Sequence, residues 1–253
     1  MKTVFITGAS SGIGEATAKL LASTKKYRLI LAARRFEIIN KLCTDLTAEF
    51  GIETLPMELD VRNNSQVQER IDGLPASWQN IDILINNAGL ARGLASIENG
   101  STEHWDEMID TNVKGLLYVS KKVLENMIKN RSGHIVNIGS IAGKEIYSMG
   151  NVYCATKHAV DALTRSMRLD LVHYPIKVSS VCPGAVETEF SVVRFSGDED
   201  RAKKVYDGFD NLEASDIAET IEWIISRPAR VNINDVVIMP TAQPMAGMII
   251  RKS

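Results

Sequence analysis

Tyr153 and Lys157 stand four positions apart in the segment NVYCATKHAV, which spans residues 151–160. Residues at i and i+4 lie on the same face of a helix, so the lysine ammonium can come within electrostatic reach of the phenol. A free tyrosine has a pKa of about 10 and is a poor base at neutral pH, whereas a neighbouring ammonium stabilises the phenolate and lowers that pKa. Such a pair could exchange a proton with an alcohol, but the same spacing also arises by chance on ordinary amphipathic helices.

A glycine-rich turn follows the first apolar run of the chain, in TGASSGIGEATAKLL, with Gly8, Gly12 and Gly14 ahead of a helical pattern. Glycine permits a tight turn and a close approach of the backbone to a pyrophosphate, whose charge the helix N-terminus favours. The spacing G-x-x-x-G-x-G departs from the commoner dinucleotide-binding fingerprint, and a plain turn between strand and helix also uses glycine. Its position after the first strand of an alternating pattern favours a dinucleotide-binding loop.

Two arginines follow the second apolar run, which ends LILAARR. In a doubly wound sheet the end of this strand lies beside the adenosine ribose, where an acidic residue favours a free 2′-hydroxyl. Here Ala33 is followed by Arg34 and Arg35, and guanidinium groups offer paired donors that match phosphate oxygens. The sequence therefore predicts NADP rather than NAD, although two arginines could also simply begin a solvated helix.

Seven short apolar runs, most of them rich in β-branched residues, alternate with amphipathic segments along the chain: TVFITG, YRLILAA, TLPMELDV, DILINNAG, HIVNIGS, KVSSVCPG and DVVIMP. This alternation predicts a parallel sheet covered by helices on both faces, with right-handed crossovers. No repeat, low-complexity tract or linker divides the sequence, so we expect one doubly wound Rossmann-type α/β domain over residues 1–253. The polar stretch 187–213 has no strand pattern and is predicted to be a substrate lid, with a solvated linker helix as the alternative.

The composition is that of an ordinary globular protein, with 45% hydrophobic and 24% charged residues. A formal net charge of -2 offers no electrostatic footprint for nucleic acid. The N-terminal segment lacks the apolar core of a secretory signal, and no uncharged apolar run reaches the roughly 18 residues that a membrane span needs. We therefore expect a cytoplasmic protein that binds neither nucleic acid nor membrane. Three scattered cysteines and four scattered histidines argue against a disulfide framework and a metal site.

The motifs TGASSGIG, NNAG, MIDTNVKG, IVNIGS, YCATK and PGAVETEF resemble, in this order and across nearly the whole chain, those of the short-chain dehydrogenase/reductase family. The resemblance implies a seven-stranded Rossmann-type fold and hydride transfer with a nicotinamide. It implies that Tyr153 is the catalytic acid/base and that Lys157 lowers its pKa and binds the nicotinamide ribose. Ser140 would hydrogen-bond the substrate oxygen. Asn112 would hold the water that links Lys157 to solvent, although taken alone it could equally cap a kink in a long helix.

The same resemblance implies the remaining cofactor contacts. Asp60 and Val61 would meet the adenine, Asn87 and Gly89 would line the floor behind it, and the segment 183–188 would meet the nicotinamide half. The predicted cofactor-binding residues are Gly8, Ala9, Ser10, Ser11, Gly12, Ile13, Gly14, Arg34, Arg35, Asp60, Val61, Asn87, Ala88, Gly89, Tyr153, Lys157, Pro183, Gly184, Val186 and Thr188.

Longer stretches, among them INNAGLARG, EHWDEMIDTNVKGL, TEFSVVRFSGDE and RVNINDVVIMPTAQ, resemble one branch of that family, the bacterial NADP-dependent 3-hydroxy acid dehydrogenases. This branch oxidises L-allo-threonine, L-serine and 3-hydroxy acids and reduces malonic semialdehyde. A substrate carboxylate needs a cation because an unpaired buried charge is costly. Arg194 is the candidate cation, which would make Ser140, Tyr153 and Arg194 the substrate-binding residues; alternatively, Arg194 pairs with Asp198 or Glu199 on the surface.

The C-terminal segment 242–253 is apolar for an exposed tail. Members of the family are usually tetramers, so the resemblance implies a homotetramer in which this tail meets another subunit; a frayed terminus is the alternative.

Two rival functions stay open. One keeps the chemistry but assigns a bulkier ketone, such as a sugar, a steroid or a carrier-bound acyl chain. The other is a sensor that binds NADP without turnover, which would be free to lose Ser140, Tyr153 or Lys157.

Overall fold

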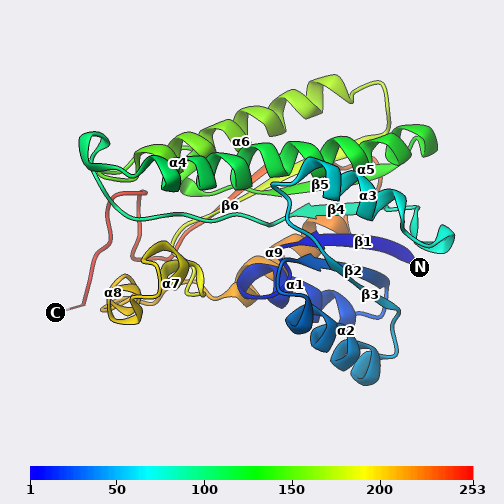
Figure 1. Cartoon of the computed structure of the whole chain (residues 1–253), viewed down its shortest axis with the longest axis horizontal. Helices are drawn as coiled ribbons and strands as arrows, with labels where there is room; N and C mark the ends of the chain where they lie inside the picture. The colour runs from blue at the N-terminus through cyan, green and yellow to red at the C-terminus, as the bar shows by residue number, and fades with distance from the viewer. Residues whose placement is uncertain (253) are drawn as a thin grey trace.

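The computed structural model describes residues 1–252, which form one sheet of seven parallel strands in the order β3, β2, β1, β4, β5, β6, β7 (Figure 1). The strands are β1 (Lys2–Thr7), β2 (Tyr27–Ala33), β3 (Thr54–Glu58), β4 (Ile83–Asn86), β5 (Gly133–Ile138), β6 (Ile176–Pro183) and β7 (Asp235–Ile238). The α-helices are α1 (Gly12–Ser23), α2 (Phe36–Phe50), α3 (Asn64–Asp72), α4 (Thr102–Ile109), α5 (Leu116–Asn130), α6 (Asn151–Asp170), α7 (Phe190–Arg194), α8 (Glu199–Lys204) and α9 (Ala214–Ile225). Short 3₁₀ turns η1 (Ala76–Trp78), η2 (Ile97–Asn99) and η4 (Ile141–Gly143) and a π-helical turn η3 (Asp110–Gly115) complete the elements.

Helices cover both faces of the sheet, as its near-continuous apolar strands require. Successive strand residues point to opposite faces, so Val4 and Ile6 of β1 join one core while Phe5 joins the other. The first core is closed by α1, α2 and α9, and the second by α3, α5 and α6. Figure 1 shows the two helical layers on either side of the strands. The predicted doubly wound, seven-stranded parallel fold is confirmed.

The strand order reverses beside β1, which pairs with β2 on one side and with β4 on the other. In open α/β sheets a ligand crevice forms at such a reversal, outside the carboxyl ends of the strands. Two predicted strands end earlier than the apolar pattern indicated: β3 stops at Glu58 rather than at Val61, and β4 stops at Asn86 rather than at Gly89. The chain leaves the sheet here because these residues turn into the wall of the crevice.

The stretch 187–213 contains α7 and α8 and touches the sheet region through one parallel bridge between Val186 and Leu212. The C-terminal tail runs back over this stretch: the backbone nitrogen of Lys252 donates to the carbonyl of Gly208 at 2.6 Å. Figure 1 shows α7, α8 and the tail together at one end of the molecule. None of the helices described within residues 1–252 is long and apolar enough to cross a membrane.

Candidate active site

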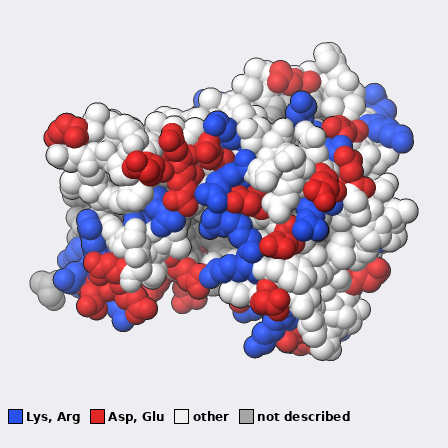
Figure 2. All heavy atoms as spheres, viewed as in Figure 1, with Lys and Arg blue, Asp and Glu red and all other residues white. Residues whose placement is uncertain are grey.

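A cavity of about 630 Å³ lies at the carboxyl ends of the strands, between the turn after β1, the start of α6 and the stretch 187–213. It brings together most of the predicted site: Gly8, Ser10, Ser11, Gly12, Ile13, Arg34, Arg35, Asp60, Val61, Asn87, Ala88, Gly89, Ser140, Tyr153, Lys157, Pro183, Gly184, Val186, Thr188 and Arg194. In Figure 2 basic side chains gather around the hollow at the centre of the view. Such a wall suits an anionic ligand.

Three predicted site residues do not line the cavity. Ala9 is buried beneath the loop, where its backbone nitrogen donates to the carbonyl of Ala32 at 3.1 Å. Gly14 packs α1 against the loop, since a Cβ there would lie only 2.4 Å from the Gly8 carbonyl oxygen. Asn112 is 2% exposed and faces protein atoms. Ala9 and Gly14 therefore shape the loop from behind rather than touch what it holds.

The loop between β1 and α1 has the backbone that its glycines allow. Gly8 and Gly12 have φ angles of +67° and +56°, in the left-handed region that L side chains rarely adopt. A Cβ on Gly8 would also lie 2.9 Å from the Ala88 backbone, and one on Gly12 would lie 3.2 Å from Thr188. The helix α1 begins at Gly12, and Ser11, Gly12 and Ile13 line the cavity, so the helix end with free backbone N–H groups lies at the cavity wall. This cradle fits a pyrophosphate.

Arg34 and Arg35 lie exposed at the mouth of the cavity, directly after β2. The Arg35 guanidinium donates to Ser10 Oγ at 3.0 Å and forms an ion pair with Glu189 at 3.0 Å. A guanidinium held over the phosphate loop, with a second one beside it, fits a ribose phosphate better than a free ribose hydroxyl. The donor set of the cavity therefore fits the predicted NADP.

Asp60 has a partner that the sequence pattern did not reveal. Arg62 forms an ion pair with its carboxylate at 2.6 Å and reaches Glu107 at 3.8 Å, while Arg92 binds Glu107 at 2.7 Å. Burial raises the pKa of Asp60, but the hydrogen bonds and charge of Arg62 outweigh it and hold that pKa below its usual value. Arg92 also donates to the Val193 carbonyl at 2.7 Å, so this chain of charges reaches α7.

Tyr153 and Lys157 lie on the first turns of α6 and are 9% and 7% exposed. The Lys157 ammonium lies 6.0 Å from the Tyr153 ring centroid and donates to the Ile138 carbonyl at 2.9 Å. Burial lowers the pKa of Lys157 to about 8, because a low-dielectric site disfavours the charged form. Both groups are therefore held in a desolvated environment at the inner end of the cavity.

The sequence analysis expected Lys157 to lower the Tyr153 pKa, and the structure places its ammonium 6.0 Å from the Tyr153 ring centroid. Burial and the nearby Tyr147 raise the pKa of Tyr153, and the net shift is upward. The Ser140 hydroxyl, by a hydrogen bond, and Arg194, by its charge, act to lower this pKa. The guanidinium of Arg194 lies 5.7 Å from the Tyr153 ring centroid.

Ser140 follows β5 and begins the turn η4. Its hydroxyl accepts a hydrogen bond from the Ala142 backbone nitrogen at 3.1 Å and lies 3.5 Å from the Pro183 carbonyl, to which it donates. The buried hydroxyl is thus held between the ends of β5 and β6, beside Tyr153.

Asn112 lies in the π-helical turn η3, which joins α4 to α5. Its side chain brackets Leu90, accepting from the Leu90 nitrogen and donating to the Leu90 carbonyl, both at 2.8 Å, and it also donates to Thr156 Oγ at 3.0 Å. A Cβ on Gly89 would lie 3.3 Å from the Asn112 amide oxygen and 3.7 Å from the Lys157 ammonium, so the two side chains are close. The amide itself is committed to protein partners.

Arg194 points into the molecule rather than toward Asp198 or Glu199. It donates to the Gly93 carbonyl at 3.0 Å and to the Tyr147 hydroxyl at 2.9 Å. The ion pairs described among residues 1–252 do not join it to either acid. Arg194 and Tyr147 together form the cavity wall next to Tyr153.

Several wall residues were missed by sequence reasoning: Arg62, Arg92, Tyr147, Phe190, Ser191, Tyr206, Gln243, Ala246 and Ile249. For Arg62 a signal existed, since it directly follows the predicted adenine-contacting pair in ELDVRN. The tail residues gave a weaker signal through their apolar character. Gln243 accepts from the Ala185 nitrogen at 2.8 Å and so fixes the tail against the end of β6.

Comparison with known proteins identifies the family of this chain. The family model described as short chain dehydrogenase matches residues 2–199. The chain is 43% identical over 251 residues to the NADP-dependent 3-hydroxy acid dehydrogenase YdfG of Salmonella typhi, covering 99% of both chains. It is 41% identical over 251 residues to the NADP-dependent 3-hydroxy acid dehydrogenase of Schizosaccharomyces pombe, covering 99% of this chain and 97% of that one.

A solved structure titled as the closed form of serine dehydrogenase complexed with NADP+ superposes with a TM-score of 0.91 at 40% identity, over 99% of this chain and all of that one. The order of motifs, the cavity at the strand ends and these full-length similarities agree. The chain belongs to the short-chain dehydrogenase family.

Proposed function

We propose that the protein is an NADP-dependent oxidoreductase that transfers a hydride between nicotinamide and the hydroxyl or carbonyl carbon of a small 3-hydroxy acid. The substrate class comprises L-allo-threonine, L-serine and 3-hydroxypropionate with its oxidised form, malonic semialdehyde. One observation carries the proposal: a single cavity has two exposed arginines at its mouth and the buried Ser140, Tyr153 and Lys157 at its inner end. The names of the relatives in bacteria and yeast support the substrate class.

The cofactor would lie along the cavity with its phosphates on the loop 8–14. Arg34 and Arg35 would hold the 2′-phosphate, Asp60 and Val61 would border the adenine, and the segment 183–188 would border the nicotinamide. When bound, NADP accepts or delivers the hydride. The protein supplies orientation, a water-poor inner end and the proton transfer.

Tyr153 would exchange the proton with the substrate oxygen, because its hydroxyl is the titratable group beside Ser140 in the cavity wall. The Ser140 hydroxyl would donate to the same oxygen and hold it in line with Tyr153. Its hydrogen bond also lowers the Tyr153 pKa, which raises the fraction of phenolate that can accept a proton during alcohol oxidation. Lys157, fixed by the Ile138 carbonyl, would orient the nicotinamide ribose and add positive charge near the phenol.

The proposal is tested by following absorbance at 340 nm with NADP or NAD. L-serine, L-allo-threonine, 3-hydroxypropionate and uncharged secondary alcohols are compared as substrates. We expect turnover with the hydroxy acids and NADP and much weaker turnover with NAD. Turnover confined to bulkier ketones in the reverse assay would replace the substrate class, and NADP binding with no turnover of any substrate would make the protein a sensor.

Arg194 would bind the substrate carboxylate. Its guanidinium already lies beside Tyr153 and Tyr147 and is partly buried, where a charge is favoured only with a partner. Changing Arg194 to Met should raise KM for a 3-hydroxy acid by about tenfold or more, the value of a charge-assisted hydrogen bond, and leave the uncharged alcohol analogue less affected. Equal losses for both substrates would refute the carboxylate contact.

We further propose that the protein is a cytoplasmic homotetramer, that residues 187–213 act as the substrate lid and that residues 242–253 contribute to a subunit contact. The tail already lies on the lid of its own chain, yet Met245, Met248 and Ile250 are 46%, 47% and 56% exposed. Exposed apolar side chains in one segment favour a protein contact. Size-exclusion chromatography with light scattering tests the assembly, and a monomer would exclude it.

A further inference from the structure

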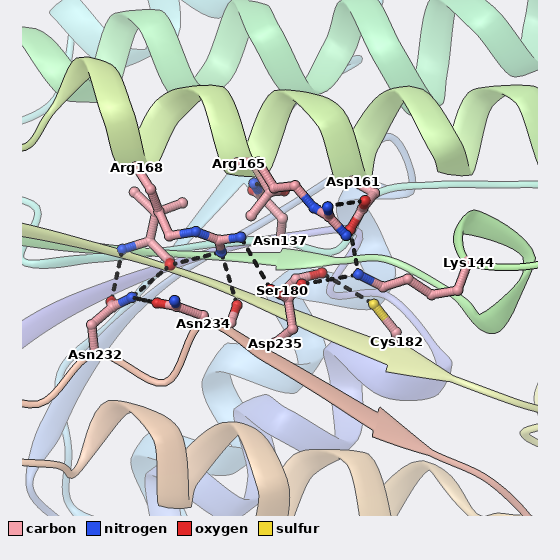
Figure 3. A network of polar contacts seen from close by, with 12 residues as sticks. Asn137, Lys144, Asp161, Arg165, Arg168, Ser180, Cys182, Asn232, Asn234 and Asp235 are labelled. Carbon is pink, nitrogen blue, oxygen red and sulfur yellow. Dashed lines mark hydrogen bonds and ion pairs between the residues drawn. The ribbon is translucent and has the colours of Figure 1, made fainter.

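A cluster of charged side chains ties the turn η4 to α6 and β7 (Figure 3). Lys144 directly follows η4, and its ammonium contacts the carboxylate of Asp161 on α6 and that of Asp235 on β7, the latter at 3.1 Å. Two arginines of α6 complete the cluster. Arg165 pairs with Asp161 at 3.0 Å and Arg168 pairs with Asp235 at 3.1 Å.

The centre of this cluster, Lys144 with its two carboxylate partners, is largely withdrawn from water, whereas the Arg165 side chain is 61% exposed. The side chains of Lys144, Asp161 and Asp235 are 19%, 15% and 28% exposed. Burial lowers the pKa of Lys144, but its hydrogen bonds to the two carboxylates outweigh that effect and the net shift is upward. The ammonium is therefore charged at neutral pH, and its two contacts are stronger than those of an exposed surface pair.

The turn that Lys144 anchors is a tightly bonded unit that starts at Ser140. The Ala142 nitrogen donates to Ser140 Oγ at 3.1 Å, the Gly143 nitrogen donates to the Ser140 carbonyl at 2.9 Å, and the Lys144 nitrogen donates to the Ile141 carbonyl at 2.9 Å. The position of Lys144 is thus coupled to that of Ser140 through the hydrogen bonds of a single 3₁₀ turn.

The same turn rests directly on the backbone of Lys157. A Cβ on Gly143 would lie 2.5 Å from the Lys157 carbonyl oxygen, so the turn and α6 touch with no side chain between them. Asp161, which receives Lys144, lies one helical turn after Lys157 on α6. Lys144 and Gly143 therefore fix the turn to α6 at two successive levels of the helix.

We propose that Lys144 is a positioning residue, which through Asp161 and Asp235 holds Ser140 in line with Tyr153 and Lys157. The inference rests on the proposed function, because it assigns the cluster to the same site. Ser140 and Tyr153 come from different elements, and a displacement of about 1 Å between reacting groups can cost up to about a hundredfold in rate. An anchor outside the cavity would limit that displacement without touching substrate or cofactor.

The test compares Lys144→Met with a matched control, Lys122→Met. Lys122 is also bound by two carboxylates, from Asp72 at 2.8 Å and Glu125 at 2.7 Å, and its side chain is 15% exposed, but it lies on α5 away from the cavity. We expect Lys144→Met to lower kcat about tenfold while KM for NADP stays within about twofold, because alignment is lost and cofactor binding is kept. Lys122→Met should leave kcat unchanged.

Two readouts separate positioning from general destabilisation. Weakening the Ser140 bond should move the pH limb of kcat that reports Tyr153 to higher pH. The other groups facing Tyr153 are Tyr147, Cys154, Arg194 and the Lys157 ammonium, and the Lys144 side chain contacts none of them. Lys144→Arg should restore kcat to within about threefold, because an arginine can keep both carboxylate contacts. A kcat loss in Lys144→Met with no shift of that limb and no rescue by arginine would overturn the proposal.

Hydrogen–deuterium exchange of the peptide 139–146 makes the test independent of the substrate. Lys144→Met should speed exchange of the amides of the turn, and Lys122→Met should not. Unchanged exchange in Lys144→Met would overturn the positioning role whether or not the substrate is known. If the unmodified protein turns over none of the hydroxy acids, only the proposed function fails.

Discussion

The two ends of the cavity hold their positive charges in opposite environments. At the mouth, Arg35 is 46% exposed and shares its guanidinium between Ser10 and Glu189. At the inner end, Lys157 is 7% exposed, and the only hydrogen bond described for its ammonium within residues 1–252 goes to the Ile138 carbonyl. Water screens a charge at the mouth, whereas burial shifts the pKa of a charge at the inner end.

This difference in exposure suits the mouth to cofactor recognition and the inner end to proton transfer. An exposed guanidinium stays charged at any physiological pH and selects a ligand by geometry and charge. A buried phenol and a buried ammonium have shifted pKa values, which is what proton transfer requires. Substitutions at the inner end should therefore act on kcat and on folding stability, and substitutions at the mouth should act on cofactor preference.

The largest effect is expected from Tyr153→Phe, which removes the acid/base hydroxyl and keeps the ring packing against Phe190. Loss of a general acid or base typically costs about 10²- to 10⁴-fold in kcat. NADPH binding, followed by cofactor fluorescence, and the melting temperature should change little. A loss of kcat of only about threefold or less, far smaller than that range, would mean that the proton is transferred by another route.

The second effect concerns Lys157→Met, which should raise folding stability although it removes activity. The pKa of Lys157 falls from 10.5 in the unfolded chain to about 8 in the folded protein. The unfolded chain therefore binds more protons between pH 8 and 10.5, so stability is lowest below pH 8 and rises as the pH passes through that window. Lys157→Met removes this cost and should stabilise the protein at pH 7 by on the order of 3 kcal/mol, while abolishing turnover.

Urea unfolding at pH 7 and at pH 9.5 measures this effect. The unmodified protein should gain stability between the two pH values relative to Lys157→Met. Lys122→Met is the control, because its carboxylate partners raise the Lys122 pKa and its loss should not stabilise the fold. A Lys157→Met variant that is less stable at pH 7 would show that the hydrogen bond to Ile138 outweighs the desolvation of the ammonium.

The same contrast explains how far the sequence could predict the site. The apolar runs determine the strands, and a parallel sheet brings their carboxyl ends to one edge, so Gly12, Arg35 and Ser140 could be placed together from pattern alone. The motif spacing also put Tyr153 and Lys157 on one helix face. None of this depends on contacts between distant segments.

What the pattern did not predict depends on such contacts. Arg194 turns toward Tyr147, which precedes it by 47 residues, and Gln243 binds the backbone of Ala185, which precedes it by 58. The Asn112 amide is taken up by Leu90, a partner with no sequence signal. The size and direction of the Tyr153 pKa shift likewise follow from the burial and neighbours that only the folded chain creates.

A smaller effect is expected at the mouth from Arg35→Leu. A hydrogen bond to a charged group contributes about 1.5–3 kcal/mol, so KM for NADP should rise roughly 10- to 100-fold. KM for NAD, which lacks the 2′-phosphate, is the internal control and should change little, as should kcat. Equal increases for both cofactors would place Arg35 on the pyrophosphate or on the loop rather than on the 2′-phosphate.

The smallest effect is expected from Glu189→Gln, at the mouth of the cavity. The Glu189 carboxylate forms an ion pair with the Arg35 guanidinium at 3.0 Å, so a 2′-phosphate that binds Arg35 would compete with this carboxylate. Both side chains are exposed, and such a pair contributes about 0–1 kcal/mol, so KM for NADP should fall by no more than about fivefold. The gain should shrink at high salt, because water and ions screen the pair.

Glu187→Gln is the matched control for this variant. Glu187 carries the same charge two positions earlier in the chain, but its carboxylate accepts a hydrogen bond from Asn211 and does not contact Arg35. If competition for Arg35 is local, Glu189→Gln lowers KM for NADP and Glu187→Gln does not. Equal gains from both would mean that the mouth senses only net negative charge, in which case the ion pair with Arg35 has no specific role in cofactor selection.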